Sequence, residues 1–89
     1  METTFIYTLS DKRGNIRYVG KTSREIKKRL YSHIKESQSS KISHKINWIK
    51  SLLNNNERPI IEIIDIVPTT EWVFWEQYWI DQFRQWGYK

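Results

Sequence analysis

The sequence contains no cysteine, which excludes disulfide scaffolds, cysteine-based zinc sites and thiol nucleophiles. Its three glycines stand apart at positions 14, 20 and 87, so no glycine-rich phosphate-binding loop is present. Two histidines without cysteine do not make a usual zinc site, and no glycine-flanked serine offers a nucleophile on a strained turn. The most common zinc, P-loop and serine-hydrolase sites are therefore excluded.

Long hydrophobic runs are also missing. The longest apolar stretch, residues 60–66, is interrupted by Glu62 and Asp65, so no segment is suited to spanning a membrane. The first four residues lack the basic and apolar regions of a signal peptide. We therefore expect a cytoplasmic protein without a membrane partner.

The 89 residues suffice for one small domain, which we place at residues 1–89. A chain of this length buries only about 60–65% of its unfolded surface, so the core must be modest. Aromatic residues make up 15% of the chain, with five Trp, five Tyr and three Phe. Large rings bury much surface per residue and compensate for the small size.

The charges are distributed unevenly. The net charge is +5, but residues 1–50 hold 12 basic and 4 acidic residues, whereas residues 51–89 hold 3 basic and 6 acidic residues. A basic half beside an acidic half suggests that one side of the fold binds a polyanion such as nucleic acid. The alternative is a solvated, lysine-rich helix face.

Two strands are predicted near the N-terminus, at residues 4–9 and 16–20, because both segments are rich in β-branched and aromatic residues. The turn residues 11–15 between them predict an antiparallel hairpin. If pairing centres on this turn, Tyr7 lies opposite Tyr18, and both rings point to the same face of the sheet.

A helix is predicted directly after the hairpin, with Thr22 or Ser23 as cap and Glu25 in the first turn. Its apolar positions recur every four residues, at Ile26, Leu30 and Ile34. Arg29 and His33 lie one turn apart on the shoulder of this apolar stripe.

The rest of the chain predicts a second helix from about Lys41 to Leu53 and a third strand at residues 60–67. Ile60, Ile64 and Ile66 point to one face of that strand and Ile61 and Ile63 to the other, a pattern typical of a central strand. A third helix follows and runs to about Gln85, where Gly87 closes it. The order ββααβα predicts a small α/β layer domain.

Glu76 is the strongest single candidate for chemistry. It lies in the middle of the apolar stripe that Trp72, Trp79, Ile80 and Phe83 form on the third helix. A carboxylate there is costly to desolvate unless it is paired, hydrogen-bonded or bound to a metal. The alternative is a structural glutamate that accepts a hydrogen bond from a tyrosine or an arginine.

The remaining candidates, two tyrosines, an arginine and a histidine, indicate an active site only in combination. Tyr7 and Tyr18 taken alone are ordinary core rings, and Arg29 and His33 taken alone are a helix surface pair. Two phenols, an arginine, a histidine and a carboxylate that converge on one concavity would instead form an active site.

These residues resemble the motifs of the GIY-YIG nuclease superfamily. The resemblance is carried by Phe5-Ile6-Tyr7, then Tyr18-Val19-Gly20, then Arg29 and His33 and finally Glu76, and it runs from Phe5 to the C-terminus. Phe5 replaces the first glycine of the motif, and Val19 replaces its second isoleucine. The segment around Glu76 and the ending Trp86-Gly87-Tyr88 are most similar to phage and intron-type homing endonucleases.

The resemblance implies an α+β fold in which three helices flank a three-stranded antiparallel sheet. It also implies a hydrolase that cleaves DNA phosphodiester bonds with one divalent cation, Mg²⁺ or Mn²⁺. By position, Glu76 would be the metal ligand, and Arg29 would stabilise the charge on the pentacovalent phosphate with assistance from Lys21. Tyr7 would be the general base, in a relay with Tyr18 and His33, although Tyr18 is an equal candidate. Nearby cations are expected to lower the pKa of the phenol that acts as base.

DNA is the expected partner, with phosphate contacts from Arg17, Lys27, Lys28 and Lys35. We also expect a DNA-binding domain beyond Lys89, since a further polar segment usually follows in homing endonucleases. A non-catalytic nucleic-acid-binding module that stacks bases on Tyr31 and Trp48 is the alternative function. A protein-interaction domain based on the Trp-rich third helix is a third possibility, although most of its rings are expected in the core.

Overall fold

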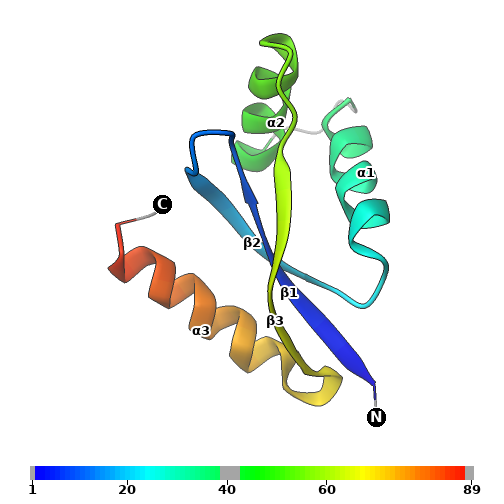
Figure 1. The fold of residues 1–89 in the computed structure, drawn as a ribbon, viewed down its shortest axis with the longest axis vertical. Helices are drawn as coiled ribbons and strands as arrows, with labels where there is room; N and C mark the ends of the chain where they lie inside the picture. The colour runs from blue at the N-terminus through cyan, green and yellow to red at the C-terminus, as the bar shows by residue number, and fades with distance from the viewer. Residues whose placement is uncertain (1, 39–42, 88–89) are drawn as a thin grey trace.

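A computed structural model describes residues 2–38 and 43–87 of the protein. Three strands form one antiparallel sheet in the order β2-β1-β3, and three helices accompany it (Figure 1). In chain order the elements are β1 (Thr3–Ser10), β2 (Ile16–Thr22), α1 (Ile26–Ser37), α2 (His44–Asn54), β3 (Ile60–Pro68), a 3-10 turn (Thr69–Glu71) and α3 (Trp72–Gln85). The predicted α+β class and the order ββααβα are confirmed.

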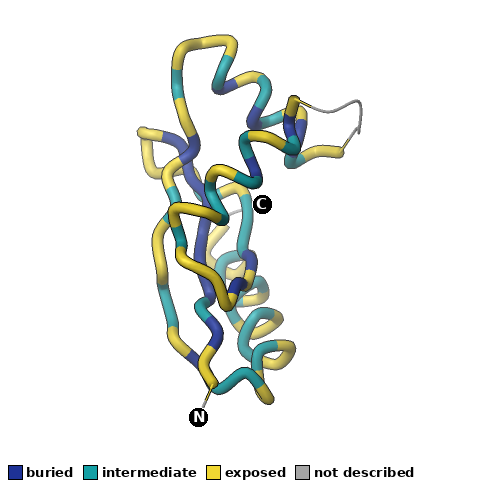
Figure 2. Tube along the Cα trace, turned by 90° about the vertical axis from the view of Figure 1, so that its right-hand side faces the viewer, coloured by how far each residue is buried: buried dark blue, intermediate teal, exposed yellow. Residues whose placement is uncertain are grey.

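The central strand is β1 and not β3, so the prediction that residues 60–67 form a central strand was wrong. Every residue of β1 from Ile6 to Ser10 is buried, as the dark central segment in Figure 2 shows. On β3, by contrast, Ile60, Ile63 and Ile66 remain partly exposed. The threonines of β1 make this strand look amphipathic in the sequence, which is not the pattern of a central strand. In the structure Thr4 and Thr8 are nevertheless both buried.

The facing of the β3 isoleucines also differs from the prediction. The pairing with β1 shifts by one residue between Ile6 and Tyr7, so that Ile64 is an extra residue in β3. Beyond this bulge the alternation is reversed, and Ile66 shares a face with Ile61 and Ile63.

The hairpin register differs from the prediction by two residues. Tyr7 pairs with Gly20, and Tyr18 pairs with Leu9, so the two tyrosines are not directly opposite each other. The loop between the strands is long, and the Asp11 carboxylate accepts hydrogen bonds from the backbone N–H groups of Arg13 and Asn15. The Asn15 side-chain amide also donates a hydrogen bond to this carboxylate and is the main cause that lowers the pKa of Asp11, with the backbone bonds adding to it. Because the register error is even, both tyrosine rings still point to the same face.

The helices cover both faces of the sheet. The Tyr7 hydroxyl contacts His33 of α1, whereas Asp65, which points to the opposite face, accepts a hydrogen bond from the Trp79 indole of α3. Figure 1 shows α1 and α3 on opposite sides of the sheet accordingly. Strand β2 is an edge strand of the sheet, so its outer edge borders both of these faces. None of the helices in the described ranges is long and apolar enough to cross a membrane.

The ends of the first two helices differ in detail from the prediction. Helix α1 begins at Ile26 with Glu25 as its cap residue, and no side chain caps it. The Thr22 hydroxyl instead accepts a hydrogen bond from the Arg24 N–H in the preceding turn. Helix α2 is capped by the Ser43 hydroxyl, and the expected start near Lys41 lies outside the described residues.

The last helix ends at Gln85 as predicted, but its rings are less buried than expected. None of its residues is fully buried, and Phe74 and Tyr78 are 64% and 39% exposed. The core consists of the strand and α2 residues Ile6, Tyr7, Leu9, Ile46, Ile49, Leu52 and Val67. Helix α3 is therefore a half-buried layer over one face of the sheet.

Candidate active site

The centre of the site is the hydroxyl of Tyr7, which lies between α1 and the sheet. It is 2.6 Å from Nε2 of His33 and accepts a hydrogen bond of 3.1 Å from Nε of Arg29. The predicted one-turn spacing of Arg29 and His33 brings both side chains to one atom of β1. Tyr7 and His33 have 0% and 1% of their surface exposed.

Tyr18 lies beside this network and makes ring contacts only. Its ring centroid is 6.2 Å from that of Tyr7 and 5.4 Å from that of His33, in tilted and edge-on arrangements. Among the described residues its hydroxyl has no hydrogen-bond partner, and the residue is half-buried. Tyr18 is therefore the phenol of the pair that solvent reaches.

Gly20 makes the close packing of the two phenols possible. A Cβ atom at this position would lie 2.6 Å from the Tyr7 hydroxyl and 2.7 Å from the Tyr18 ring. Such distances are far below van der Waals contact, so any side chain would displace one of the tyrosines. This explains why the second tyrosine motif ends in glycine.

The titration of this buried network is strongly perturbed. Burial raises the pKa of Tyr7 to about 12, although the hydrogen bond from Arg29 acts in the opposite direction. Burial also lowers the pKa of His33 to about 4, with the charges of Lys45 and Arg29 contributing. Arg29 thus lowers the pKa of Tyr7 as expected, but desolvation of the phenolate outweighs this effect, so the pKa is raised in the protein alone.

At neutral pH His33 is consequently uncharged, and its Nε2 atom and the Tyr7 hydroxyl form a hydrogen bond between two neutral groups. The other ring nitrogen, Nδ1, is buried without a hydrogen-bond partner in the described part of the chain. An unsatisfied buried polar atom costs stability and is uncommon in folded proteins. This arrangement is thus unfavourable for stability and is typical of a site built for function.

Glu76 lies on the half-buried face of α3, as the sequence pattern predicted. Burial raises the pKa of its carboxyl group, and the charge of Lys21 opposes this shift. Within the described ranges, Glu76 makes neither a hydrogen bond nor an ion pair. The alternative of a structural glutamate bonded to a tyrosine or arginine thus has no support in its contacts.

The side chain of Lys21 lies on the same side of the sheet as Glu76, opposite to the Tyr7 hydroxyl. Its register partner is Ile6, so its side chain leaves β2 on the face that α3 covers, and its Nζ lies 4.5 Å from the centre of the Trp72 ring. The site thus has two parts on either side of the β2 edge. One residue of each part, Lys21 and Arg29, lines a polar pocket of about 300 Å³ together with Thr22, Ser23 and Arg24. The Glu76 charge also contributes to the raised pKa of Tyr7.

The candidate site suits a divalent cation that is held by one carboxylate and otherwise by water. No group of three or more His, Cys, Asp or Glu residues that would hold a metal exists in the described part of the chain. A single half-buried carboxylate without a protein partner fits a hard cation that keeps most of its water ligands, as Mg²⁺ does. The donor set does not fit zinc, which prefers several nitrogen or sulfur ligands.

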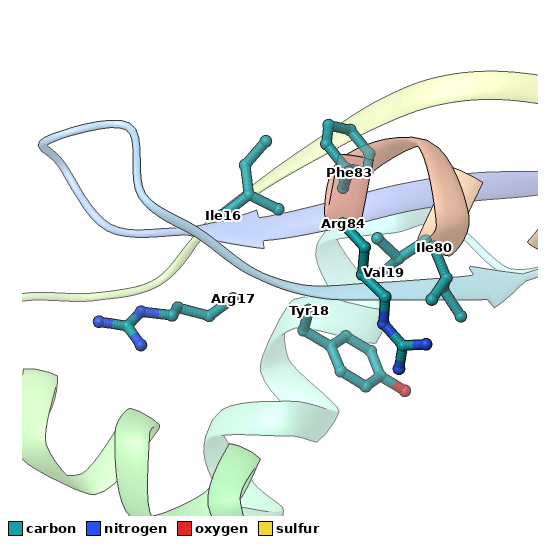
Figure 3. A pocket seen from close by; sticks show the side chains of 7 residues that line it. All are labelled: Ile16, Arg17, Tyr18, Val19, Ile80, Phe83 and Arg84. Carbon is teal, nitrogen blue, oxygen red and sulfur yellow. The ribbon is translucent and has the colours of Figure 1, made fainter. Parts of the chain in front are cut away.

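Two cations near Tyr18, Lys45 and Arg84, were not predicted from the sequence. Nζ of Lys45 on α2 lies 5.0 Å from the centre of the Tyr18 ring and 3.0 Å from a carboxylate oxygen of Glu36. Arg84 of α3 lines a pocket of about 250 Å³ together with Tyr18 and Arg17, and Figure 3 shows its side chain extending across β2 toward the side of the Tyr18 ring. Lysine and arginine are common on helices, so only their position in the fold distinguishes these two.

The predicted phosphate-binding residues fall into two groups. Arg17 is exposed and lines the pockets on either side of Tyr18. Lys27, Lys28 and Lys35 are exposed on α1, turned away from the face that carries Arg29 and His33. Arg17 is therefore near the site, whereas the three lysines lie on the outer surface of α1.

One of three comparisons with known proteins gives a match. The family described as the GIY-YIG catalytic domain matches residues 3–89. Neither the curated proteins nor the solved structures give a match. The family match covers nearly the whole chain and includes every residue of the site.

Proposed function

Because the chain belongs to the GIY-YIG catalytic domain family, and is thus a nuclease-type catalytic domain, we propose that it is a divalent-metal-dependent DNA endonuclease. The observation that carries this proposal is the Tyr7 hydroxyl held between Arg29 and His33, together with a half-buried carboxylate without a described partner, Glu76, on the other side of β2. Hydrolysis of a phosphodiester needs an activated water, a group that stabilises the phosphate charge and a neutralised leaving oxygen.

The cation would be held by Glu76, with water as its remaining ligands. When bound, it would neutralise charge on the phosphate and lower the pKa of a coordinated water molecule. The raised pKa of Glu76 supports this role, because an isolated carboxylate in a partly buried position gains stability from a cation.

We assign the general base to Tyr7, because its hydroxyl alone contacts both Arg29 and His33. As Tyr7 takes a proton from water, it passes its own proton to Nε2 of His33, which is uncharged at neutral pH. Since Tyr7 has no exposed surface, this role requires that the substrate draw Arg29 away from the hydroxyl. Tyr18 is the alternative base, which is reached by solvent without such a movement.

Arg29 is assigned to the phosphate. It lines the polar pocket together with Lys21 and Arg24, so a phosphate in this pocket meets three cations. A guanidinium group binds two phosphate oxygens at once and stabilises the charge that accumulates in the transition state. Lys21 contributes as a second positive charge near Glu76.

We further propose that the domain acts in the cytoplasm as the catalytic part of a homing-type endonuclease, with sequence recognition in a separate domain. The exposed cations Arg17, Lys27, Lys28 and Lys35 suit contacts with phosphates, which position a protein on DNA but do not read its sequence.

The decisive experiment is the incubation of supercoiled plasmid with the purified protein and Mg²⁺ or Mn²⁺. We expect nicked or linear DNA with the cation and intact plasmid with excess EDTA. Binding of DNA without cleavage under every cation condition would overturn the enzymatic assignment. It would support the non-catalytic nucleic-acid-binding module instead.

A further inference from the structure

A groove next to the candidate site has no role in the mechanism described so far. It has a volume of about 710 Å³ and is lined by Arg17 and Tyr18 of β2 and by His44, Lys45 and Trp48 of α2. Tyr18 also contacts the Tyr7–His33 network, so the groove begins where the proposed reaction centre ends. The groove is thus continuous with the site.

The composition of the groove is that of a nucleotide-binding surface. Arg17 supplies a charge that no described residue neutralises, and Trp48 supplies a half-buried aromatic ring. Lys45 forms an ion pair with Glu36 and lies over the Tyr18 ring, so a second cation stands at this wall of the groove. Cations beside an aromatic ring bind single-stranded nucleic acid by combining phosphate contacts with base stacking.

We propose that this groove binds one unpaired base of the DNA strand, next to the phosphate that is cleaved. The base stacks on Trp48, and its phosphate contacts Arg17. This inference rests on the proposed nuclease function, since it places the scissile phosphate at Tyr7 and Arg29. A paired base shows only its edges in the grooves of a duplex, so stacking on a side chain requires that the base leave the helix.

The proposal is tested by fluorescence anisotropy with a labelled ten-nucleotide dT strand and an abasic strand of equal length and charge. The Glu76→Gln protein is used without divalent cations, so that no strand is cut. The dT strand should bind about 5- to 150-fold more tightly than the abasic strand, the range expected for stacking of one base. Trp48→Leu should remove this difference, whereas Trp48→Phe, which keeps a ring, should retain most of it.

Two controls make the result specific. Trp86 is an exposed ring near the end of α3, away from the groove, so Trp86→Leu should leave the preference for the dT strand unchanged. Trp48→Leu should also leave the affinity for a duplex of the same length unchanged. Circular dichroism of each variant establishes that it is folded.

Equal affinity of the Glu76→Gln protein for the two strands would overturn the proposal. A loss of duplex binding in Trp48→Leu equal to its loss of dT binding would also overturn it. This outcome is separate from that of the plasmid assay. If the protein cleaves plasmid but shows no base preference, only the proposal of a base-binding groove is contradicted. If it binds in a base-dependent way but does not cleave, only the nuclease assignment is contradicted.

Discussion

The hydroxyl of Tyr7 and Nε2 of His33 are 2.6 Å apart in the buried interior of the protein, although 26 positions separate the two residues in the chain. One is a phenol with a pKa raised to about 12 and the other an imidazole with a pKa lowered to about 4. Both groups are neutral at pH 7, and burial keeps them so because it disfavours each charged form. Either group can therefore become charged only when a neighbouring group of opposite charge stabilises it, such as Arg29 for the phenolate or a bound phosphate for the imidazolium.

Glu76→Gln should abolish metal-dependent plasmid cleavage, because it removes the charge of the proposed ligand and preserves the shape of the side chain. The free energy of unfolding should stay equal or rise slightly, since a partly buried carboxylate without a partner is unfavourable. Asp81→Asn on the exposed face of the same helix is the matched control and should cleave normally. Cleavage by Glu76→Gln at the wild-type rate would show that Glu76 is structural.

Arg29→Ala should lower the cleavage rate by roughly 10²- to 10³-fold, because the lost group acts mainly on charge that develops in the transition state. DNA affinity, measured by anisotropy, should change little. Lys28→Ala, one position away on the exposed face of α1, removes a proposed phosphate contact outside the site, so it should weaken DNA binding but retain the turnover rate. Weakened binding with an unchanged turnover rate would instead make Arg29 a simple phosphate contact.

The two tyrosines should respond differently to the loss of their hydroxyl groups. Tyr7→Phe leaves Arg29 Nε and His33 Nε2 without a partner, so we expect a loss of about 1–3 kcal/mol in stability and the larger loss of cleavage. Tyr18→Phe removes no hydrogen bond within the described structure and should change stability by less than about 0.5 kcal/mol. Urea unfolding and initial cleavage rates check both effects. A greater loss of cleavage in Tyr18→Phe would identify Tyr18 as the base.

The depressed pKa of His33 predicts how stability depends on pH. The unfolded chain binds a proton on this histidine near pH 6.5, whereas the folded protein does so near pH 4. The stabilisation is therefore complete above pH 6.5 and is lost as the pH falls toward 4. Its size is on the order of 3 kcal/mol. The difference in unfolding free energy between the wild type and His33→Gln should shrink as the pH is lowered from 7 to 4.5, and a constant difference would contradict this assignment.

Gly20→Ala should destabilise the protein by about 1–3 kcal/mol, because the added methyl group meets the Tyr7 hydroxyl and the Tyr18 ring at distances that only a shift of the rings relieves. Cleavage should fall at temperatures where the variant is still folded, since the shift misplaces both phenols. Urea unfolding followed by circular dichroism measures the first effect, and wild-type values for both properties would show that the hairpin adjusts without strain.

Local patterns in the sequence were enough to predict the secondary structure and most of the candidate site. The β-branched and aromatic residues of 4–9 and 16–20, with the turn residues between them, predicted the hairpin, and the spacing of Arg29 and His33 predicted that both lie on one side of α1. The apolar neighbours of Glu76 predicted a half-buried carboxylate. These features follow from the strand and helix periods, which the chain expresses within a few residues.

Other features were decided by contacts between distant segments. The central position of β1 depends on pairing with β3, more than fifty residues later, and the bulge at Ile64 reverses the facing of Ile66. The roles of Lys45 and Arg84 near Tyr18 depend on where α2 and α3 pack against β2. No local pattern contains this information.

The sequence alone was sufficient to specify which residue types are available for chemistry and the spacing that aligns them on each helix or strand. Only the tertiary structure placed Lys21 with Glu76 on one side of β2 and Tyr7 with Arg29 and His33 on the other. It also set the direction of the Tyr7 pKa, which is raised although a guanidinium group touches the hydroxyl. The physical reason is that desolvation depends on how many atoms of the whole fold surround a group, and this is fixed only when the layers have packed together.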